Sequence, residues 1–300
     1  MTNSTAMATE TSTPADSAGE PLVILAAGGR LPIEVATAAR KAGRDVLIIG
    51  LEGEADEGIT AFPHATAKWG QIGRVEDLIR AHRAREVVVI GSVSRRPDFG
   101  SMAVDLGTLR YLPRLIKGMF GGDDTILGNF AKFAEERGYR IVGAHEVAPD
   151  LVAEAGPVAG RMPVGATFAD AKLALDAARA IGAIDAGQAA VAIGLRVVAL
   201  EAAEGTDAML ERVEALRAAG RVKWSGRAGV LAKRAKPQQD LRLDMPAIGP
   251  RTVEAVVRIG LAGIAIEAGR VMIAEREETV ALADRTGTFI FADGDPSGRQ

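Results

Sequence analysis

Leu22-Val-Ile-Leu-Ala-Ala-Gly-Gly29 is the stretch that decides the fold of the first half of the chain. Its apolar run predicts a short buried strand, and the two glycines end that strand before an amphipathic helix from about Leu31 to Lys41. Adjacent glycines let backbone amides approach an anion at a helix N-terminus. The spacing fails the GxGxxG dinucleotide fingerprint, because the later glycine is absent and Pro32 stands in the first helical turn. Gly28 and Gly29 are therefore candidate phosphate-binding residues, with a purely structural turn as the alternative.

The same alternation of strand and helix continues outward from this stretch. Strands are expected at Asp45–Gly50 and Glu86–Gly91, with a helix at Val75–Arg83 between them. Their continuous Val and Ile content implies burial on both faces, which predicts a parallel, doubly wound sheet and a Rossmann-like N-terminal domain. Ligands bind such sheets at the carboxyl ends of the strands, where Ser92 follows the third strand.

Two further elements complete this half. A helix is predicted from Asp124 to Arg137, with Asp124 as its N-cap, followed by a strand at Tyr139–Gly143. Asp123 and Asp124 carry oxygen donors suited to a metal ion, and capping is the alternative use for at least one of them.

The second half is separated from the first by residues 148–165, a stretch rich in Pro, Gly and Ala that predicts an interdomain segment between domains 21–147 and 166–300. A mixed α/β domain is expected after it. It begins with a helix from Phe168 to Ala183 and a strand pair that turns at Gly194. Thr206 is expected to cap the next helix, whose first-turn amides could meet a phosphate.

A connector at 231–249 carries the densest chemistry in the chain. Pro237 and Pro246 make a regular helix through it improbable. Lys236, Gln239 and Asp244 stand among further cationic, amide and carboxylate groups, a mixture that suits a phosphorylated ligand with a metal ion. A solvated surface loop is the alternative.

Composition bounds the function. The chain has 300 residues, 48% of them hydrophobic, with no cysteine and three histidines. Disulfides and thiolate chemistry are excluded, and a multi-histidine zinc centre is improbable, so magnesium or manganese is the natural ion. A formal charge of -3 gives no basic field for nucleic acid. Residues 1–20 are typical of a disordered tail, and with no signal or membrane-spanning pattern we expect a cytoplasmic protein, with peripheral membrane contact left open.

Six motifs together resemble the LpxI family, in chain order from about residue 21 to 296. They are Gly28-Gly-Arg-Leu-Pro32, Gly91-Ser-Val-Ser-Arg-Arg-Pro-Asp-Phe99, Gly122-Asp-Asp-Thr-Ile-Leu127, Gly143-Ala-His-Glu-Val147, Glu204-Gly-Thr-Asp-Ala-Met-Leu210 and Lys236-Pro-Gln-Gln-Asp-Leu-Arg-Leu-Asp-Met-Pro-Ala-Ile-Gly249. Ala27 stands where the family commonly has a third glycine, and Ser92 stands where it commonly has an asparagine.

The resemblance implies a metal-dependent UDP-2,3-diacylglucosamine pyrophosphatase of lipid A biosynthesis, with a cleft between two α/β domains. It implies Asp244 as the catalytic residue and metal ligand, with Mg²⁺ or Mn²⁺ as cofactor. The expected substrate-binding residues are Gly28, Gly29, Ser92, Asp123, Gln188, Thr206, Asp207, Lys236 and Gln239. A homodimer stays open. The alternatives are a general nucleotide-sugar pyrophosphatase, a nicotinamide oxidoreductase and a non-catalytic nucleotide-binding or lipid-binding protein.

Overall fold

A computed structural model describes residues 19–93, 108 and 123–294 of the protein. The expected N-terminal tail falls almost entirely outside these residues. The side chains of residues 123–127 are also outside the description, although their backbone is within it.

Five parallel strands form the first sheet, in the order β3-β2-β1-β4-β5. They are β1 (Leu22–Ala26), β2 (Val46–Leu51), β3 (His64–Ala67), β4 (Glu86–Ile90) and β5 (Arg140–Ile141). The chain leaves β1 toward β2 and later returns to β1's other side as β4, so the connections diverge between β1 and β4. This is the topological switch point at which open α/β sheets bind ligands. The expected doubly wound parallel sheet is confirmed.

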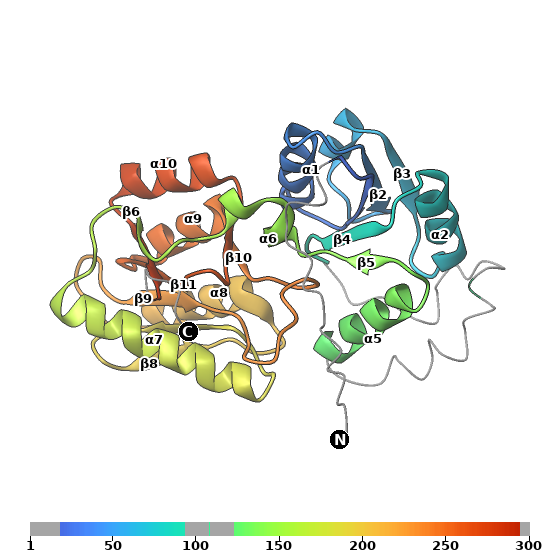
Figure 1. Ribbon diagram of the computed structural model, residues 1–300. Coiled ribbons are helices and arrows are strands. Elements are labelled where there is room, and N and C mark those ends of the chain that lie inside the picture. Colours follow the sequence, from blue (N-terminus) through green and yellow to red (C-terminus); the bar gives the residue numbers. More distant parts are fainter. Residues whose placement is uncertain (1–18, 94–107, 109–122, 295–300) are drawn as a thin grey trace, which may run out of the picture.

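Helices cover both faces of this sheet (Figure 1). One face is covered by α1 (Leu31–Lys41) and the short α6 (Ala144–Val147), which bury residues such as Val35 and Ala144 against β1 and β4. The other face is covered by α2 (Ile72–Ala81) and α5 (Asp123–Glu135), which contribute Ile79 and Ala131 to a second core. Two short 3-10 helices, η2 (Glu57–Ala61) and η4 (Pro149–Leu151), also belong to this part of the chain.

Three details of this domain differ from the sequence expectation. The edge strand β3 was not predicted, because His-Ala-Thr-Ala lacks the Val and Ile content of the other strands. Helix α2 begins at Ile72, three residues earlier than expected, and Thr108 Oγ1 accepts the Ile72 amide at 2.9 Å, a cap from 36 residues away. Helix α5 begins at Asp123, so Asp124 lies inside the helix and is not its N-cap.

The second sheet has six strands in the order β6-β13-β11-β9-β7-β8. They are β6 (Gly156–Ala159), β7 (Ala189–Ala192), β8 (Val197–Leu200), β9 (Val230–Lys233), β11 (Gly263–Glu267) and β13 (Phe289–Asp293). The three central strands β13, β11 and β9 are parallel, whereas β6, β7 and β8 are antiparallel to their neighbours. The β7–β8 hairpin is as expected. Strand β6 was not, since it lies within the stretch expected to link the domains.

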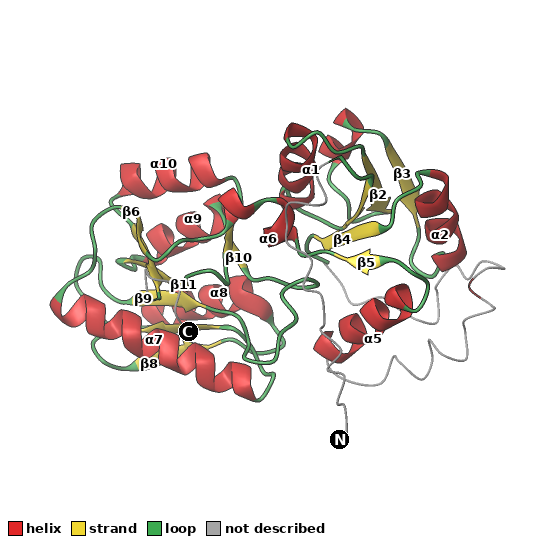
Figure 2. Ribbon diagram, in the orientation of Figure 1, coloured by secondary structure: helices red, strands yellow, loops and turns green. Residues whose placement is uncertain are grey.

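Helices sandwich the second sheet as well (Figure 2). Helix α7 (Gly165–Ala183) covers one face with Ala171, Ala174 and Leu175. The other face packs against α8 (Gly205–Ala218), α9 (Pro250–Ile259) and α10 (Arg276–Thr286). A small parallel pair, β10 (Ala247–Ile248) with β12 (Met272–Ile273), lies outside both large sheets. The mixed α/β C-terminal domain is confirmed.

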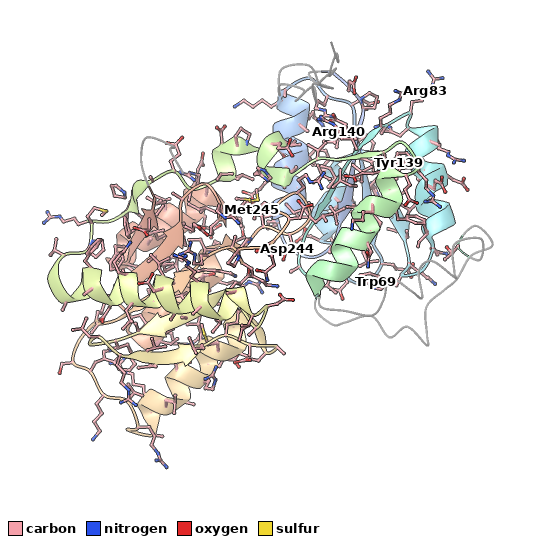
Figure 3. The ribbon with its side chains drawn as sticks, turned by 60° about the horizontal axis from the view of Figure 1, so that its bottom comes forward. Trp69, Arg83, Tyr139, Arg140, Asp244 and Met245 are labelled. Atoms are coloured by element: carbon pink, nitrogen blue, oxygen red, sulfur yellow. The ribbon has the colours of Figure 1, made fainter. Side chains whose placement is uncertain are left out.

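The connector between β9 and β10 joins the two domains physically. It leaves the second sheet at Lys233, and Arg242 Nη1 then lies 3.0 Å from Glu135 Oε1 at the end of α5. Leu243 belongs to the core on the α2 and α5 face of the first sheet, whereas Met245 packs against the core on the α1 and α6 face. Asp244 stands between these two anchors, and Figure 3 shows it between the two halves of the molecule. As expected, no helix forms within residues 234–246.

No helix within the described ranges is long and apolar enough to cross a membrane.

Candidate active site

Polar residues gather at one edge of the second sheet because of its strand directions. The carboxyl ends of β9, β11 and β13 meet at this edge, as do the start of β7 and the end of β8, since β7 runs opposite to β9 and β8 opposite to β7. The residues placed here include Gln188, Glu201, Arg234, Glu267 and Asp293. Ligands bind open α/β sheets at this edge, and the connector that carries Asp244 starts from it.

Three of the predicted residues are joined directly by hydrogen bonds in the connector. Gln239 is 7% exposed, and its Oε1 accepts the Lys236 amide at 3.0 Å while its Nε2 donates to Asp244 Oδ2 at 2.5 Å. The Asp244 amide donates to the carbonyl of Asp240 at 3.1 Å. Because one carboxylate oxygen and the backbone of Asp244 are both held, the second oxygen, Oδ1, has a defined direction.

The ammonium group of Lys236 is tied to the end of α7. Its Nζ lies 2.6 Å from Asp185 Oδ1, in the turn that follows that helix. The last turn of α7 itself holds Gln238, whose Nε2 donates to the Gly182 carbonyl at 3.0 Å. A side chain at Gly182 would be tightly packed, since an added Cβ would lie 3.3 Å from Lys236 Cα. Helix α7 therefore fixes the start of the connector.

A buried glutamate, Glu201, holds Gln188 and Thr206 together in a second part of the site. Glu201 is 7% exposed, and its two oxygens accept the Gln188 amide and the Thr206 hydroxyl, each at 3.0 Å. Thr206 is the second residue of α8 and Glu204 is the residue before that helix, so the expectation that Thr206 caps it is wrong. The Thr206 hydroxyl is used by Glu201, which leaves the first-turn amides of α8 without that cap.

Arg234, at the start of the connector, joins it to Gln188 and Glu267. Its amide donates to the Gln188 carbonyl at 3.0 Å, and its Nη2 lies 2.6 Å from Glu267 Oε1. Two buried atoms here, Arg234 Nε and Gln188 Oε1, have no hydrogen-bond partner among the described residues. Buried polar atoms are normally paired, so an open donor on Arg234 and an open acceptor on Gln188 indicate places for a polar ligand group or water.

Charges on the connector are fixed by a second ion pair. The hydrogen bonds from Arg242 hold the pKa of the Asp240 carboxyl below its usual range, and the same contact raises the pKa of Arg242. Asp240 is thus an anion already occupied by Arg242. Among the contacts between described residues, Asp244 is the carboxylate of this stretch that has no cationic partner.

The N-terminal domain places its predicted residues at the switch point. Gly28 follows β1 and Ser92 follows β4, and the two residues exchange backbone hydrogen bonds of 2.8 and 2.9 Å. A Cβ on Gly28 would lie 2.9 Å from the Ser92 carbonyl oxygen. The Gly28 amide is therefore consumed by Ser92, and the expected phosphate cradle is left with Gly29 and the residues after it. Gly29 and Ser92 are both exposed.

The predicted site residues thus fall into two groups. Lys236, Gln239 and Asp244 are in direct contact, and Gln188 and Thr206 join them through Glu201 and Arg234. Gly28, Gly29 and Ser92 lie on the other domain. Asp207 is exposed in the first turn of α8, and the side chain of Asp123 lies outside the described residues.

Sequence reasoning missed three carboxylates of this edge. They are Asp185, Glu201 and Glu267. Glu201 and Glu267 had a readable signal, because each stands at the end of a predicted strand, where α/β proteins place functional groups.

A divalent ion fits this site only if substrate phosphates and waters supply most of its ligands. No group of three or more His, Cys, Asp or Glu side chains suited to a metal occurs within the described part of the chain. Magnesium is commonly bound by one or two carboxylates together with substrate phosphates and waters, and Asp244 supplies one carboxylate oxygen that is not hydrogen-bonded to Gln239.

The molecule is a two-domain α/β protein, with a Rossmann-like domain followed by a second α/β domain. Its site, with a carboxylate on the connector between the domains, suits phosphate chemistry. Comparison with known proteins narrows this class. The sequence model of the LpxI N-terminal domain matches residues 21–151, and that of the LpxI C-terminal domain matches residues 154–291. The UDP-2,3-diacylglucosamine pyrophosphatase LpxI of Caulobacter vibrioides is 41% identical over 270 residues, which cover 90% of this chain and 96% of that protein. The chain belongs to the LpxI family.

Proposed function

We propose that this protein hydrolyses the pyrophosphate bond of UDP-2,3-diacylglucosamine, giving UMP and 2,3-diacylglucosamine 1-phosphate for lipid A biosynthesis. The observation that carries the proposal is the 41% identity, across nearly the whole of both chains, to a relative named for this pyrophosphatase activity. The hydrogen-bonded set of Lys236, Gln239 and Asp244 supports it, because it presents an oriented carboxylate at the edge where α/β folds bind ligands.

Asp244 is the proposed catalytic residue. Hydrolysis forms a bond from a water oxygen to one phosphorus and breaks the bridging P–O bond, and the water's proton must be accepted as the bond forms. The carboxylate of Asp244, held through Oδ2 by Gln239, is placed to orient that water with Oδ1. Lys236 and Arg234 contribute positive charge near the developing negative charge of the phosphates.

Asp244 is also the residue we propose to hold Mg²⁺ or Mn²⁺. When bound, the ion supplies charge neutralisation to the pyrophosphate, and the substrate itself would provide further oxygen ligands. Gly29 and Ser92 on the first domain, with Gln188 and Thr206 on the second, are proposed to contact the substrate, whereas Gln239 is proposed to position Asp244. We further propose a cytoplasmic protein that meets its lipid substrate by peripheral contact with the inner membrane.

The test uses the purified full chain and the diacylated substrate, with products separated by chromatography. We expect turnover with Mg²⁺ or Mn²⁺, none in excess EDTA, and none for Asp244→Ala. The matched control is Asp176→Ala, which removes an exposed aspartate from α7. Hydrolysis in ¹⁸O-labelled water shows which phosphorus is attacked, because the label appears in one product only.

Two outcomes would overturn the proposal. Wild-type turnover by a folded Asp244→Ala variant removes Asp244 from the mechanism. Tight substrate binding without any hydrolysis, in the presence of either ion, would instead favour a nucleotide-binding or lipid-binding protein.

A further inference from the structure

The end of the second domain that faces away from the first carries exposed apolar side chains beside arginines. Helix α7 begins at this outer end and runs toward the N-terminal domain (Figure 1). We name as the outer patch six exposed residues of the loop before α7, its first turn and the β7–β8 turn: Arg161, Met162, Val164, Phe168, Leu195 and Arg196. Val164 is 79% exposed and Leu195 is 65% exposed, and apolar side chains gathered in one exposed patch with polar residues at its edge are typical of a binding surface.

The two turns of the outer patch are held together by one buried carboxylate. Asp170 in α7 is 3% exposed, and its oxygens accept the amides of Gly194 and Leu195 at 2.9 and 2.6 Å. This fixes the β7–β8 turn against the first turns of α7. The apolar side chains at the start of the helix and in the turn therefore form one rigid surface.

Val164 and Leu195 both occupy positions where the local backbone structure favours a different residue. Val164 is the N-cap of α7, a position at which Ser, Thr, Asp and Asn are strongly preferred over Val because their side chains satisfy a free helical amide. Leu195 has a φ of 60°, a left-handed conformation suited to Gly or Asn and costly for leucine. Neither side chain gains compensating burial, so the fold itself does not account for them.

Cations outnumber anions around these apolar groups. Arg161 and Arg196 flank them, and Arg221 and Lys223 are exposed in the loop that returns from α8 to β9 at the same end of the sheet. None of these four cations forms an ion pair with a described carboxylate. The nearby acidic groups, Asp170 and Asp284, each accept backbone amides. The protein as a whole carries a formal charge of -3, so this positive end is a local feature.

We propose that the outer patch is a docking surface for the face of an anionic lipid bilayer. Val164, Leu195, Met162 and Phe168 would enter the interfacial region, while the arginines meet anionic headgroups. Exposed apolar side chains rimmed by Lys and Arg are the combination that binds proteins to such surfaces. A second copy of this chain fits less well, because a two-fold contact through the patch would bring arginines of both copies together.

The experiment measures binding of the full chain to phosphatidylcholine vesicles with and without phosphatidylglycerol, by co-sedimentation without substrate. The test variant is Val164→Ser with Leu195→Asn, which places the residue that each local conformation prefers. The matched control is Ile184→Ser, since Ile184 is 76% exposed at the opposite end of α7. Thermal midpoints and oligomeric state by light scattering are recorded for each protein.

We expect binding to anionic vesicles, at least about tenfold weaker binding to neutral ones, and a loss of about tenfold in the double variant. The double variant should have a thermal midpoint equal to or above that of the wild type, which a purely structural role would not give. Ile184→Ser should bind like the wild type. Absent vesicle binding, equal losses in both variants, or a loss of dimer in the double variant without a change in vesicle binding would each overturn the proposal. Because no substrate is present, these outcomes are independent of the hydrolase assignment.

Discussion

Gln239 is expected to act by positioning Asp244, and replacing it with leucine tests this. The side chain is 7% exposed and makes two hydrogen bonds, one from the Lys236 amide and one to the Asp244 carboxylate. A neutral hydrogen bond contributes about 0.5 to 1.5 kcal/mol and one to a charged group about 1.5 to 3 kcal/mol. Leucine fills similar volume but restores neither bond, so Gln239→Leu should lower the free energy of unfolding by about 2 to 4.5 kcal/mol.

The kinetic effect should appear in kcat. Without the amide donor, Asp244 Oδ2 is free to rotate, and a misplacement of about 1 Å can reduce catalysis by about a hundredfold. The substrate's own contacts are less affected, so KM should change far less than kcat. Gln239→Glu should lose kcat in the same way, because a carboxylate cannot donate to Asp244.

The neighbouring residue supplies the control. Gln238 is exposed and donates one neutral hydrogen bond to the Gly182 carbonyl, so Gln238→Leu should cost at most about 1 kcal/mol and leave kcat near that of the wild type. Urea unfolding and steady-state kinetics are measured for all variants. A Gln239→Leu protein with unchanged kcat and a raised KM would refute positioning and show that Gln239 contacts substrate instead.

Three further predictions follow from other parts of the molecule. Burial raises the pKa of Glu34 above its ordinary value of 4.5, so the stability that Glu34 contributes is complete below about pH 4.5 and is lost as pH rises through the raised pKa. Glu34→Gln should therefore gain stability relative to the wild type between about pH 4.5 and 7. A difference in the free energy of urea unfolding that stays constant with pH would contradict this. Gly91→Ala should destabilise the protein by about 3 kcal/mol, because φ is 117° and a Cβ would lie 2.7 Å from the backbone of Ala27. Gly43→Ala, with φ of 81° and open space around the added Cβ, should cost about 1 to 2 kcal/mol. Equal costs in urea unfolding would argue against a close approach of Gly91 to the Ala27 backbone. UDP-N-acetylglucosamine should be a poor substrate beside UDP-2,3-diacylglucosamine, since each buried acyl methylene contributes about 0.8 kcal/mol and a few per chain raise affinity more than a hundredfold. Similar kcat/KM values for these two compounds would favour a general nucleotide-sugar pyrophosphatase.

Local sequence was sufficient for the elements that bury a continuous or periodic apolar pattern. Leu22–Ala26, the helix from Leu31 to Lys41 and the β7–β8 hairpin were all predicted, because each is specified by its own residues. The six motifs likewise sufficed to place the chain in its family. They also predict Asp244 and the connector as the centre of the chemistry, which the Asp244 and Gln239 variants test.

Tertiary structure decided what depends on residues far apart in the chain. Helix α2 starts early because Thr108 caps it, and Gly156–Ala159 becomes a strand because β13 offers it a free edge. Thr206 and Gln188 are organised by Glu201, whose place at a strand end is readable in the sequence but whose two hydrogen-bond partners are not. The sequence determined which groups could do phosphate chemistry, whereas strand direction and the docking of Leu243 and Met245 on the first domain decided which of them meet, since hydrogen bonds between distant segments form only once the cores on both sides are packed.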